Sequence, residues 1–254
     1  MNRRCTICAL ALAALLLTAC SSEAAGPPSP TPGEEEPLPG DFSTDVYRIV
    51  DGAETGLLLL AGTEGGAGSV FTLDVSDLDL AQPLADGMLV DVTHNCVVQE
   101  TFPLQWSAGA VQDVRPTEGQ TTDDRFGLCL QVLEDLWAVD PGLNEGITEL
   151  GVDFSGLTGF TDSEKAAVAY AFGMAHGIMP ITGTYEELVE QGYIDGEELL
   201  WDDGCLFSIT GSLEEGFEAQ KWRSGLGAYF YTDCTAKMAK DGTWSYEIGG
   251  EAIS

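Results

Sequence analysis

Two basic side chains near the end of a predicted strand have types and spacing that allow specific chemistry. Lys221 and Arg223 lie two positions apart in a run that continues through Ser224 and Gly225 to Gly227. Alternate residues of a strand point to the same face, so both cations share one face. Together with the amides of the glycine-rich residues beyond them, they could hold an anion or a carboxylate. In the alternative interpretation, both cations pair with nearby acids while Trp222 fills the core.

The two histidines of the chain do not indicate a catalytic site. His94 lies at a predicted turn, and His176 ends a predicted helix, where attraction to the helix dipole is a sufficient structural role for a cation. The motifs HExxH, GxSxG and SxxK, which mark zinc peptidases, α/β-hydrolases and serine penicillin-binding enzymes, are absent. We therefore predict no catalytic residue, no metal ligand and no cofactor.

Carboxylates are numerous enough to supply an acid and a base. Asp162 with Glu164, or Asp202 with Asp203, could converge in a cleft and act as a glycosidase-like pair. The alternative is that these groups are solvated surface residues. A small cell-envelope hydrolase that uses carboxylates is therefore kept as an alternative function.

The start of the chain indicates export. Arg3 and Arg4 precede an apolar stretch over residues 7–17, which is too short to span a bilayer and fits a secretory signal. The run from Leu17 to Cys20 resembles the lipobox of bacterial lipoproteins. The resemblance implies cleavage after residue 19, a diacylglyceryl thioether on Cys20, and attachment to the outer face of the cell membrane, with the lipid bilayer as a partner. An ordinary signal peptide and an uncleaved anchor helix are the alternatives.

Residues 20–44 read as a tether that follows the lipidated cysteine. They hold six prolines and the acidic run Glu34-Glu35-Glu36, with almost nothing apolar to bury. Such a composition predicts a disordered, extended segment. Its expected role is to hold the folded part away from the membrane.

The remaining cysteines favour a disulfide without fixing it. Cys5 and Cys8 leave with the signal peptide, which leaves Cys96, Cys129, Cys205 and Cys234 with three possible pairings. An exported location permits disulfides. Cys205 and Cys234 lie in the same strand-rich region and form the preferred pair. The alternative is four unpaired, mostly buried thiols.

The charge of the chain excludes one class of partner. It has 42 acidic and 10 basic residues, with a net charge of −32. Such a surface repels phosphate backbones, so we expect no nucleic-acid partner. An unknown protein or small molecule remains possible as a partner.

The pattern of the first half predicts a small all-β module over residues 45–116. Short strands alternate with turns, and the segments 88–94 and 97–102 are predicted to form a hairpin joined at Asn95 and Cys96. The run from Gly87 to Val92, followed by Val97 to Gln105, resembles the closing hairpin of small OB-like barrels in uncharacterised Gram-positive lipoproteins. That family implies a binding module without known catalytic residues.

Residues 122–254 are predicted to form an α+β module. Thr122 can cap a helix that runs to about Val139, with apolar residues at helical spacing. Thr161 and Thr184 each begin a capping-box pattern, and strands with turn signals follow from residue 204. We expect a mostly antiparallel C-terminal sheet with helices packed on one side. This module is similar to the C-terminal domains of other unannotated lipoproteins.

The fold class is therefore predicted as α+β, with an OB-like barrel followed by an α+β domain. The predicted function is that of a membrane-anchored extracytoplasmic lipoprotein, a non-enzymatic binding or interaction module. Its alternatives are the carboxylate hydrolase and the ligand-capturing component of an uptake system.

Overall fold

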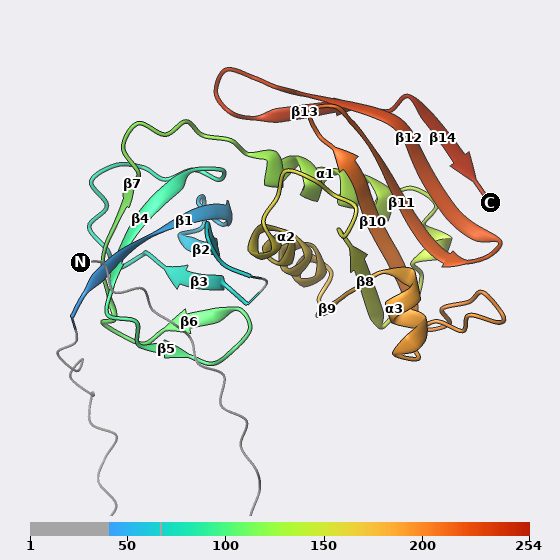
Figure 1. The fold of residues 1–254 in the computed structure, drawn as a ribbon, viewed down its shortest axis with the longest axis horizontal. Helices are drawn as coiled ribbons and strands as arrows, with labels where there is room; N and C mark the ends of the chain where they lie inside the picture. Colours follow the sequence, from blue (N-terminus) through green and yellow to red (C-terminus); the bar gives the residue numbers. More distant parts are fainter. Residues whose placement is uncertain (1–40, 67) are drawn as a thin grey trace, which may run out of the picture. The chain divides into compact units, whose positions relative to one another are not determined.

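The computed structural model describes residues 41–66 and 68–254. The predicted signal peptide, Cys20 and the tether up to residue 40 lie outside the described residues. The described part is a mixed α+β fold in which two seven-stranded sheets accompany three α-helices (Figure 1).

The first sheet, which we call sheet A, uses the first third of the described chain. Its strands are β1 (Ser43–Asp51), β2 (Leu57–Gly62), β3 (Val70–Asp74), β4 (Leu89–His94), β5 (Val98–Gln99), β6 (Leu104–Trp106) and β7 (Val111–Pro116). They are hydrogen-bonded in the order β5-β6-β3-β2-β1-β4-β7, and β3 with β6 is the parallel pair. One apolar cluster takes side chains from both ends of this order, including Trp106 of β6 and Val114 of β7.

The predicted hairpin between residues 88–94 and 97–102 is wrong. Strand β4 pairs with β1 and β7, whereas β5 pairs with β6. The turn after β4 explains the difference. Asn95 accepts a hydrogen bond from the Val97 amide at 3.1 Å, and Cys96 takes a φ of 62°, so the chain turns away from β4 instead of folding back along it.

The helices begin where short polar side chains can cap them. Helix α1 (Arg125–Ala138) is capped by Asp124 rather than by Thr122, and the short 3-10 turn η1 (Pro141–Leu143) follows it. Helices α2 (Asp162–Ala175) and α3 (Tyr185–Glu190) begin at Thr161 and Thr184. Both predicted capping boxes are confirmed, since each threonine accepts from a glutamate amide and that glutamate accepts from the threonine amide.

The second sheet, sheet B, fills the C-terminal half. Its strands are β8 (Glu149–Asp153), β9 (Pro180–Thr182), β10 (Gly204–Ser212), β11 (Gly216–Ser224), β12 (Gly227–Met238), β13 (Trp244–Glu247) and β14 (Gly250–Ile253). Strand β8 is parallel to β10 and β9, and the other pairs are antiparallel, which confirms a mostly antiparallel sheet.

Helix α2 lies between the two sheets. Its residues 166–175 are apolar on nearly every side, a pattern typical of a helix buried all round. It contacts β1, β2 and β3 of sheet A as well as β9 and α1 (Figure 1). The largest apolar cluster accordingly joins Val50, Ala61 and Val70 of sheet A to Phe172 of α2 and Phe207 of sheet B.

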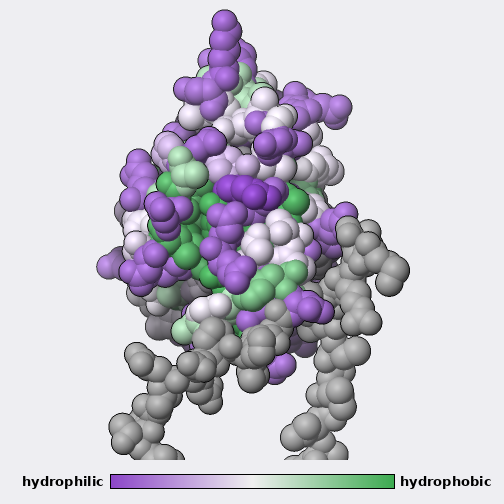
Figure 2. Space-filling model, turned by 90° about the vertical axis from the view of Figure 1, so that its left-hand side faces the viewer, coloured by the Kyte–Doolittle hydropathy of each residue, from purple (hydrophilic) through white to green (hydrophobic). Residues whose placement is uncertain are grey.

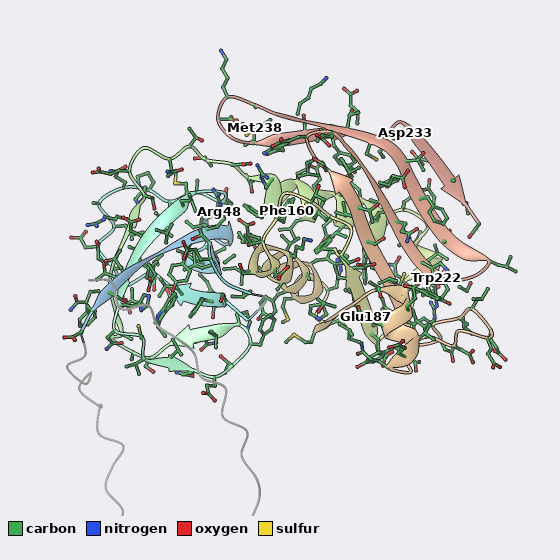
Figure 3. All side chains as sticks on the ribbon, viewed as in Figure 1. Arg48, Phe160, Glu187, Trp222, Asp233 and Met238 are labelled. Atoms are coloured by element: carbon green, nitrogen blue, oxygen red, sulfur yellow. The ribbon has the colours of Figure 1, made fainter. Side chains whose placement is uncertain are left out.

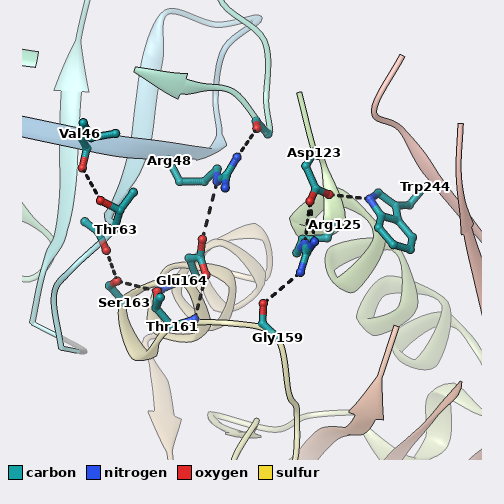
Figure 4. Close-up of polar contacts among 12 residues, drawn as sticks. Val46, Arg48, Thr63, Asp123, Arg125, Gly159, Thr161, Ser163, Glu164 and Trp244 are labelled. Atoms are coloured by element: carbon teal, nitrogen blue, oxygen red, sulfur yellow. Dashed lines mark hydrogen bonds and ion pairs between the residues drawn. The ribbon is translucent and has the colours of Figure 1, made fainter. Parts of the chain in front are cut away.

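Polar contacts reinforce the junction of α2 with sheet A (Figure 4). Ser163, which is fully buried, donates to the carbonyl of Gly62 at 2.6 Å. Glu164 lies 3.7 Å from the Arg48 guanidinium.

Arg125 donates to Asp123 at 2.6 Å, and Asp123 also accepts from the Trp244 indole at 2.7 Å. Sheet B falls within the predicted range 122–254, whereas sheet A begins at Ser43, two residues before the predicted range 45–116 and inside the segment predicted as a tether. Both α1 and α2 contribute to the core that the two sheets share.

Candidate functional site

The two faces of sheet B differ in what covers them. Side chains alternate between faces along a strand. In β10, Cys205, Phe207 and Ile209 belong to the large core, whereas Leu206 and Ser208 point to the opposite face. Helices are therefore found on both faces rather than on one, because α1 covers the first face and α3 lies over part of the second.

Helix α3 and the segment after it cover one end of the second face. Leu188, Ile194 and Trp201 form a small core with Leu206. The Tyr185 ring meets the Trp222 ring edge-on, with 5.0 Å between centroids, and Figure 3 shows Trp222 beside α3. A side chain at position 151 would come within 2.7 Å of the Trp201 ring, so Gly151 is needed beneath it.

The remainder of this face is a cleft of about 250 Å³, which we call the open-face cleft. The strand register places its residues in rows: Ser208 lies opposite Gln220, which lies opposite Phe230, and Thr210 lies opposite Glu218. The lining residues are Ser208, Thr210, Glu218, Ala219, Gln220, Phe230, Tyr231 and Thr232. They combine hydroxyls, an amide and an aromatic ring with a single carboxylate.

Several polar side chains of this cleft have no hydrogen-bond partner in the part of the chain that the structure describes. Ser208 is only 4% exposed, and within residues 41–66 and 68–254 its hydroxyl has no hydrogen-bond partner but still reaches solvent. The side chains of Thr210 and Gln220 are partly exposed and also lack a hydrogen-bond partner over those residues. Such groups are hydrated in the free protein, and a ligand that offers matching hydrogen-bonding groups can take the place of that water. These groups are free to bind a ligand in the cleft.

The predicted anion site at Lys221 and Arg223 is not formed. Both side chains share a face, as predicted, but that face is opposite to the cleft. Lys221, with no exposed surface, donates to the carbonyls of Val139 and Asp140 and to the Asn144 side chain. The C-terminal carbonyls of a helix lack internal partners, and a lysine satisfies them well at the end of α1.

Arg223 is occupied in the same way. It donates to the carbonyls of Leu143, Glu145 and Asp202 at 3.3, 3.0 and 2.8 Å. Burial lowers the pKa of Lys221. Because both cations bind backbone carbonyls, they fix the connection between α1 and β8 and do not attract an anion.

The predicted Cys205–Cys234 disulfide is absent, since both thiols are free and buried. The strand register explains why. Strand β11 separates their strands, and Cys234 lies opposite Phe217, which in turn lies opposite Gly211. Cys205 is six positions from Gly211, about 20 Å along the strand, whereas a disulfide needs α-carbons about 4.4–6.8 Å apart. Cys129 is also free and buried.

The structure places the two predicted carboxylate pairs in different surroundings. Asp162 and Glu164 begin α2, where the Glu164 carboxylate accepts from the Thr161 amide at 2.8 Å. Asp202 and Asp203 line a second cavity, of about 370 Å³, together with Glu149. Its other lining residues are Gln191, Gly192, Tyr193 and Trp201. The Trp201 indole donates to Glu149 at 2.7 Å.

A third group of carboxylates was not predicted as a unit. Burial raises the pKa of Asp124 to about 6, and the neighbouring charges of Asp86, Asp123 and Asp51 add to the shift. Burial and Asp86 also raise the pKa of Asp51. Asp124 accepts from the Gly127 amide at 2.9 Å, so its role in the fold is to cap α1.

Both histidines have structural partners. His94 is the last residue of β4 rather than part of a turn, and its imidazole lies 3.1 Å from Asp45 and 3.3 Å from the Tyr47 hydroxyl. His176 stacks on Trp137 and lies 3.0 Å from Glu134. Among the described residues no group of three or more His, Cys, Asp or Glu side chains is arranged to hold a metal ion.

The surface of sheet A has a different character. Figure 2 shows hydrophobic residues gathered in the middle of one side of the molecule, with hydrophilic ones around them. The exposed large hydrophobic residues in the sheet A part of the chain include Phe42, Val46, Leu57, Val97 and Phe102. Exposed apolar patches can mark protein interaction sites, and the predicted protein partner stays a prediction.

Sequence reasoning missed the open-face cleft, although a signal was present. Ser208 and Thr210 alternate with apolar residues in β10, and Glu218 and Gln220 do so in β11. This period of two predicts a polar second face for each strand. The rows that join the strands could not be read from the sequence.

In the part of the chain that the structure describes, none of the helices combines the length and apolar character needed to cross a membrane. Protein-family models, curated proteins and solved structures contain no match to this chain, so its functional assignment depends on the geometry above.

Proposed function

We propose that this chain is a lipid-anchored extracytoplasmic protein that binds a ligand in the open-face cleft without transforming it. One observation carries the binding role: polar side chains of Ser208, Thr210 and Gln220 line a concavity and lack protein partners among the described residues. Ligand sites are typically concave, with a few convergent polar groups beside aromatic rings.

The anchoring part of the proposal depends on Cys20, which lies outside the described residues. Its support is the sequence from Leu17 to Cys20 and the proline-rich segment that follows. Acyl chains on a cysteine give stable attachment to a bilayer. Through the tether, the folded part reaches beyond the membrane surface and presents its cleft to the exterior. The charge of −32 argues against a nucleic-acid ligand.

The same proposal includes an OB-like character for sheet A. Its support is the parallel pair of β3 with β6, the antiparallel pair of β1 with β4, and the apolar cluster that joins both ends of the strand order. OB folds are partly open five-stranded barrels. An experimental structure in which β6 or β5 closes onto β4 or β7 would support this assignment, and a flat, open sheet would contradict it.

The anchor is tested with the full chain, including its leader, in a bacterium that processes lipoproteins. Cells grown with an alkyne-tagged fatty acid should label the wild-type protein and the matched control Ser21→Ala, and both should be found in the membrane fraction. Cys20→Ser should lose the label. An equally labelled Cys20→Ser protein would contradict the anchor.

Binding is tested on the same full-length protein, purified in detergent. Native mass spectrometry should detect a mass adduct from the host envelope on the wild type, and the double variant Gln220→Ala with Phe230→Leu should lose it. The matched control is Gln112→Ala with Phe42→Leu, both in the sheet A part of the chain. An adduct that persists in the cleft variant, or no adduct on the wild type, would overturn the binding role.

The cavity lined by Glu149, Asp202 and Asp203 favours a second candidate, the carboxylate hydrolase. A general acid and a base must face one substrate, and this cavity brings three carboxylates to one concave surface. Hydrolysis of cell-envelope glycans that disappears in both Asp202→Asn and Asp203→Asn, and persists in Asp162→Asn, would establish it. Equal rates in all three variants would exclude it.

A further inference from the structure

We propose that the open-face cleft binds a single sugar ring of an uncharged carbohydrate, an inference that rests on the proposed binding function and names the class of its ligand. Three properties of the cleft, namely its hydrogen-bonding groups, its aromatic ring and its size and charge, point to this class.

The hydrogen-bonding groups match a polyhydroxylated ligand. The hydroxyls of Ser208, Thr210 and Thr232 can each donate and accept, and the Gln220 amide does both with separate atoms. A sugar presents several hydroxyls that also donate and accept, so each pair can be satisfied in either direction. Ser208 is the least exposed of them, at 4%, and its hydroxyl reaches solvent without a hydrogen-bond partner among the described residues.

The aromatic ring supplies the apolar half of the site. Phe230 lies directly opposite Gln220 in the strand register, so an amide and a ring border the same space. A pyranose has polar edges and a flat C–H face. The electron-rich face of an aromatic ring attracts polarised hydrogens, which favours stacking of that C–H face. A ligand that is polar at its edges and apolar on one face therefore fits this row.

Size and charge exclude the main competitors. The cleft, at about 250 Å³, is smaller than the roughly 300–1,000 Å³ of common small-molecule sites, so it suits one ring rather than a large ligand. No lysine or arginine lines it, and Lys221 and Arg223 bind carbonyls on the other face, so an anion finds no counter-charge. The only charged lining residue is the exposed Glu218, whereas a cationic ligand would find three carboxylates in the other cavity.

The test uses the full-length protein in detergent and measures binding by saturation-transfer NMR and titration calorimetry. The probes are the methyl glycosides of glucose, galactose, mannose and N-acetylglucosamine, with glucuronic acid and glucosamine as charged competitors. At least one neutral glycoside should bind, and both charged sugars should bind more weakly. Gln220→Ala and Phe230→Leu should each weaken binding about fivefold, as expected for one lost hydrogen-bonding group or one lost stacking contact.

The controls Gln112→Ala and Phe42→Leu lie on sheet A or just before it and should change the affinity by less than about twofold. Unchanged thermal unfolding of the cleft variants shows that a weaker affinity does not come from misfolding. Tighter binding of the charged sugars, or equal binding by the cleft variants, would overturn the carbohydrate assignment.

This outcome is separable from the fate of the proposed function. If the host-derived adduct depends on Gln220 and Phe230 but none of the neutral glycosides binds, the ligand class is wrong and the binding role stands. If neither the adduct nor a glycoside depends on these residues, both proposals fail.

Discussion

The two faces of sheet B handle polar groups in opposite ways. On the face that α1 covers, Lys221 is buried without exposed surface and donates to three carbonyls and to the Asn144 side chain. On the other face, Ser208 is only 4% exposed, but its hydroxyl reaches solvent and has no hydrogen-bond partner among the described residues. The comparison teaches that the first set of polar groups stabilises the fold, whereas the second is left available to a ligand. The predictions below test this difference.

The largest effect is expected on the covered face. Lys221→Met keeps the apolar stem but leaves the last carbonyls of α1 and the Asn144 amide without a donor. We expect a loss of about 3 kcal/mol in the free energy of unfolding, the range found for a broken buried charged contact. Urea denaturation at pH 7 measures it, with the exposed Lys240→Met as the control. Equal stability of the two variants would refute the structural role of Lys221.

The next effect concerns the end of the open face that α3 covers. In Gly151→Ala the added methyl group would lie 2.7 Å from the Trp201 ring, which is itself buried. We expect a loss of about 2 kcal/mol, because overfilled cores typically lose this much. Gly66→Ala is the matched control, since nothing lies within 4 Å of its added carbon. Thermal unfolding of both variants decides the matter.

A smaller effect comes from the start of α1. The folded pKa of Asp124, about 6, lies above the ordinary aspartate value of about 3.9. Between these values the folded state holds more protons than the unfolded state, so this group lowers stability as pH rises through that window, and the loss is complete above about pH 6.

The variant Asp124→Asn isolates this contribution, because asparagine keeps the cap acceptor for Gly127 without the charge. The free energy of unfolding of this variant, relative to that of wild type, should be about 1 kcal/mol higher at pH 7.5 than at pH 4.5. This figure is reduced for partial solvent screening. Denaturant titrations at the two pH values measure the difference, and the exposed Glu118→Gln should show none. A wild-type advantage that grows with pH would contradict the assigned shift.

The smallest effect is expected in the cleft. Ser208→Ala and Gln220→Ala remove groups that have no hydrogen-bond partner among the described residues, so each should change the free energy of unfolding by less than about 0.5 kcal/mol. The contrast with Lys221→Met is the sharpest measure of the two faces. If either cleft variant lost more than about 2 kcal/mol in the free energy of unfolding, the group would stabilise the fold and would not be available to a ligand.

Local sequence signals predicted individual helices and strands better than they predicted which strands pair with each other. The capping boxes at Thr161 and Thr184 were read correctly, because a cap depends only on residues three positions apart. The short strands β8 and β9, which precede residue 204, were not predicted, since three to five residues carry little periodicity. The partner of β4 was wrong for a different reason: β7 is distant in the sequence, and only the turn at Cys96 directs β5 away.

The candidate site shows the same limit. The spacing of Lys221 and Arg223 correctly placed both on one face, but the sequence could not show that α1 ends there. Conversely, the alternation around Ser208 and Gln220 indicated a polar face, but a cleft arises only when three strands align these residues in register.

The position of α2 also governs how the protein can be divided. Phe172 and its neighbours contribute to one apolar cluster that includes Val70 of sheet A and Phe207 of sheet B. If the chain were divided between residues 116 and 122, the apolar surface of α2 would be exposed in one fragment. The apolar face of sheet A that α2 covers would be exposed in the other. Because each fragment would expose an apolar surface, we expect neither to be stable alone. The folded region should therefore be exported and studied as one unit.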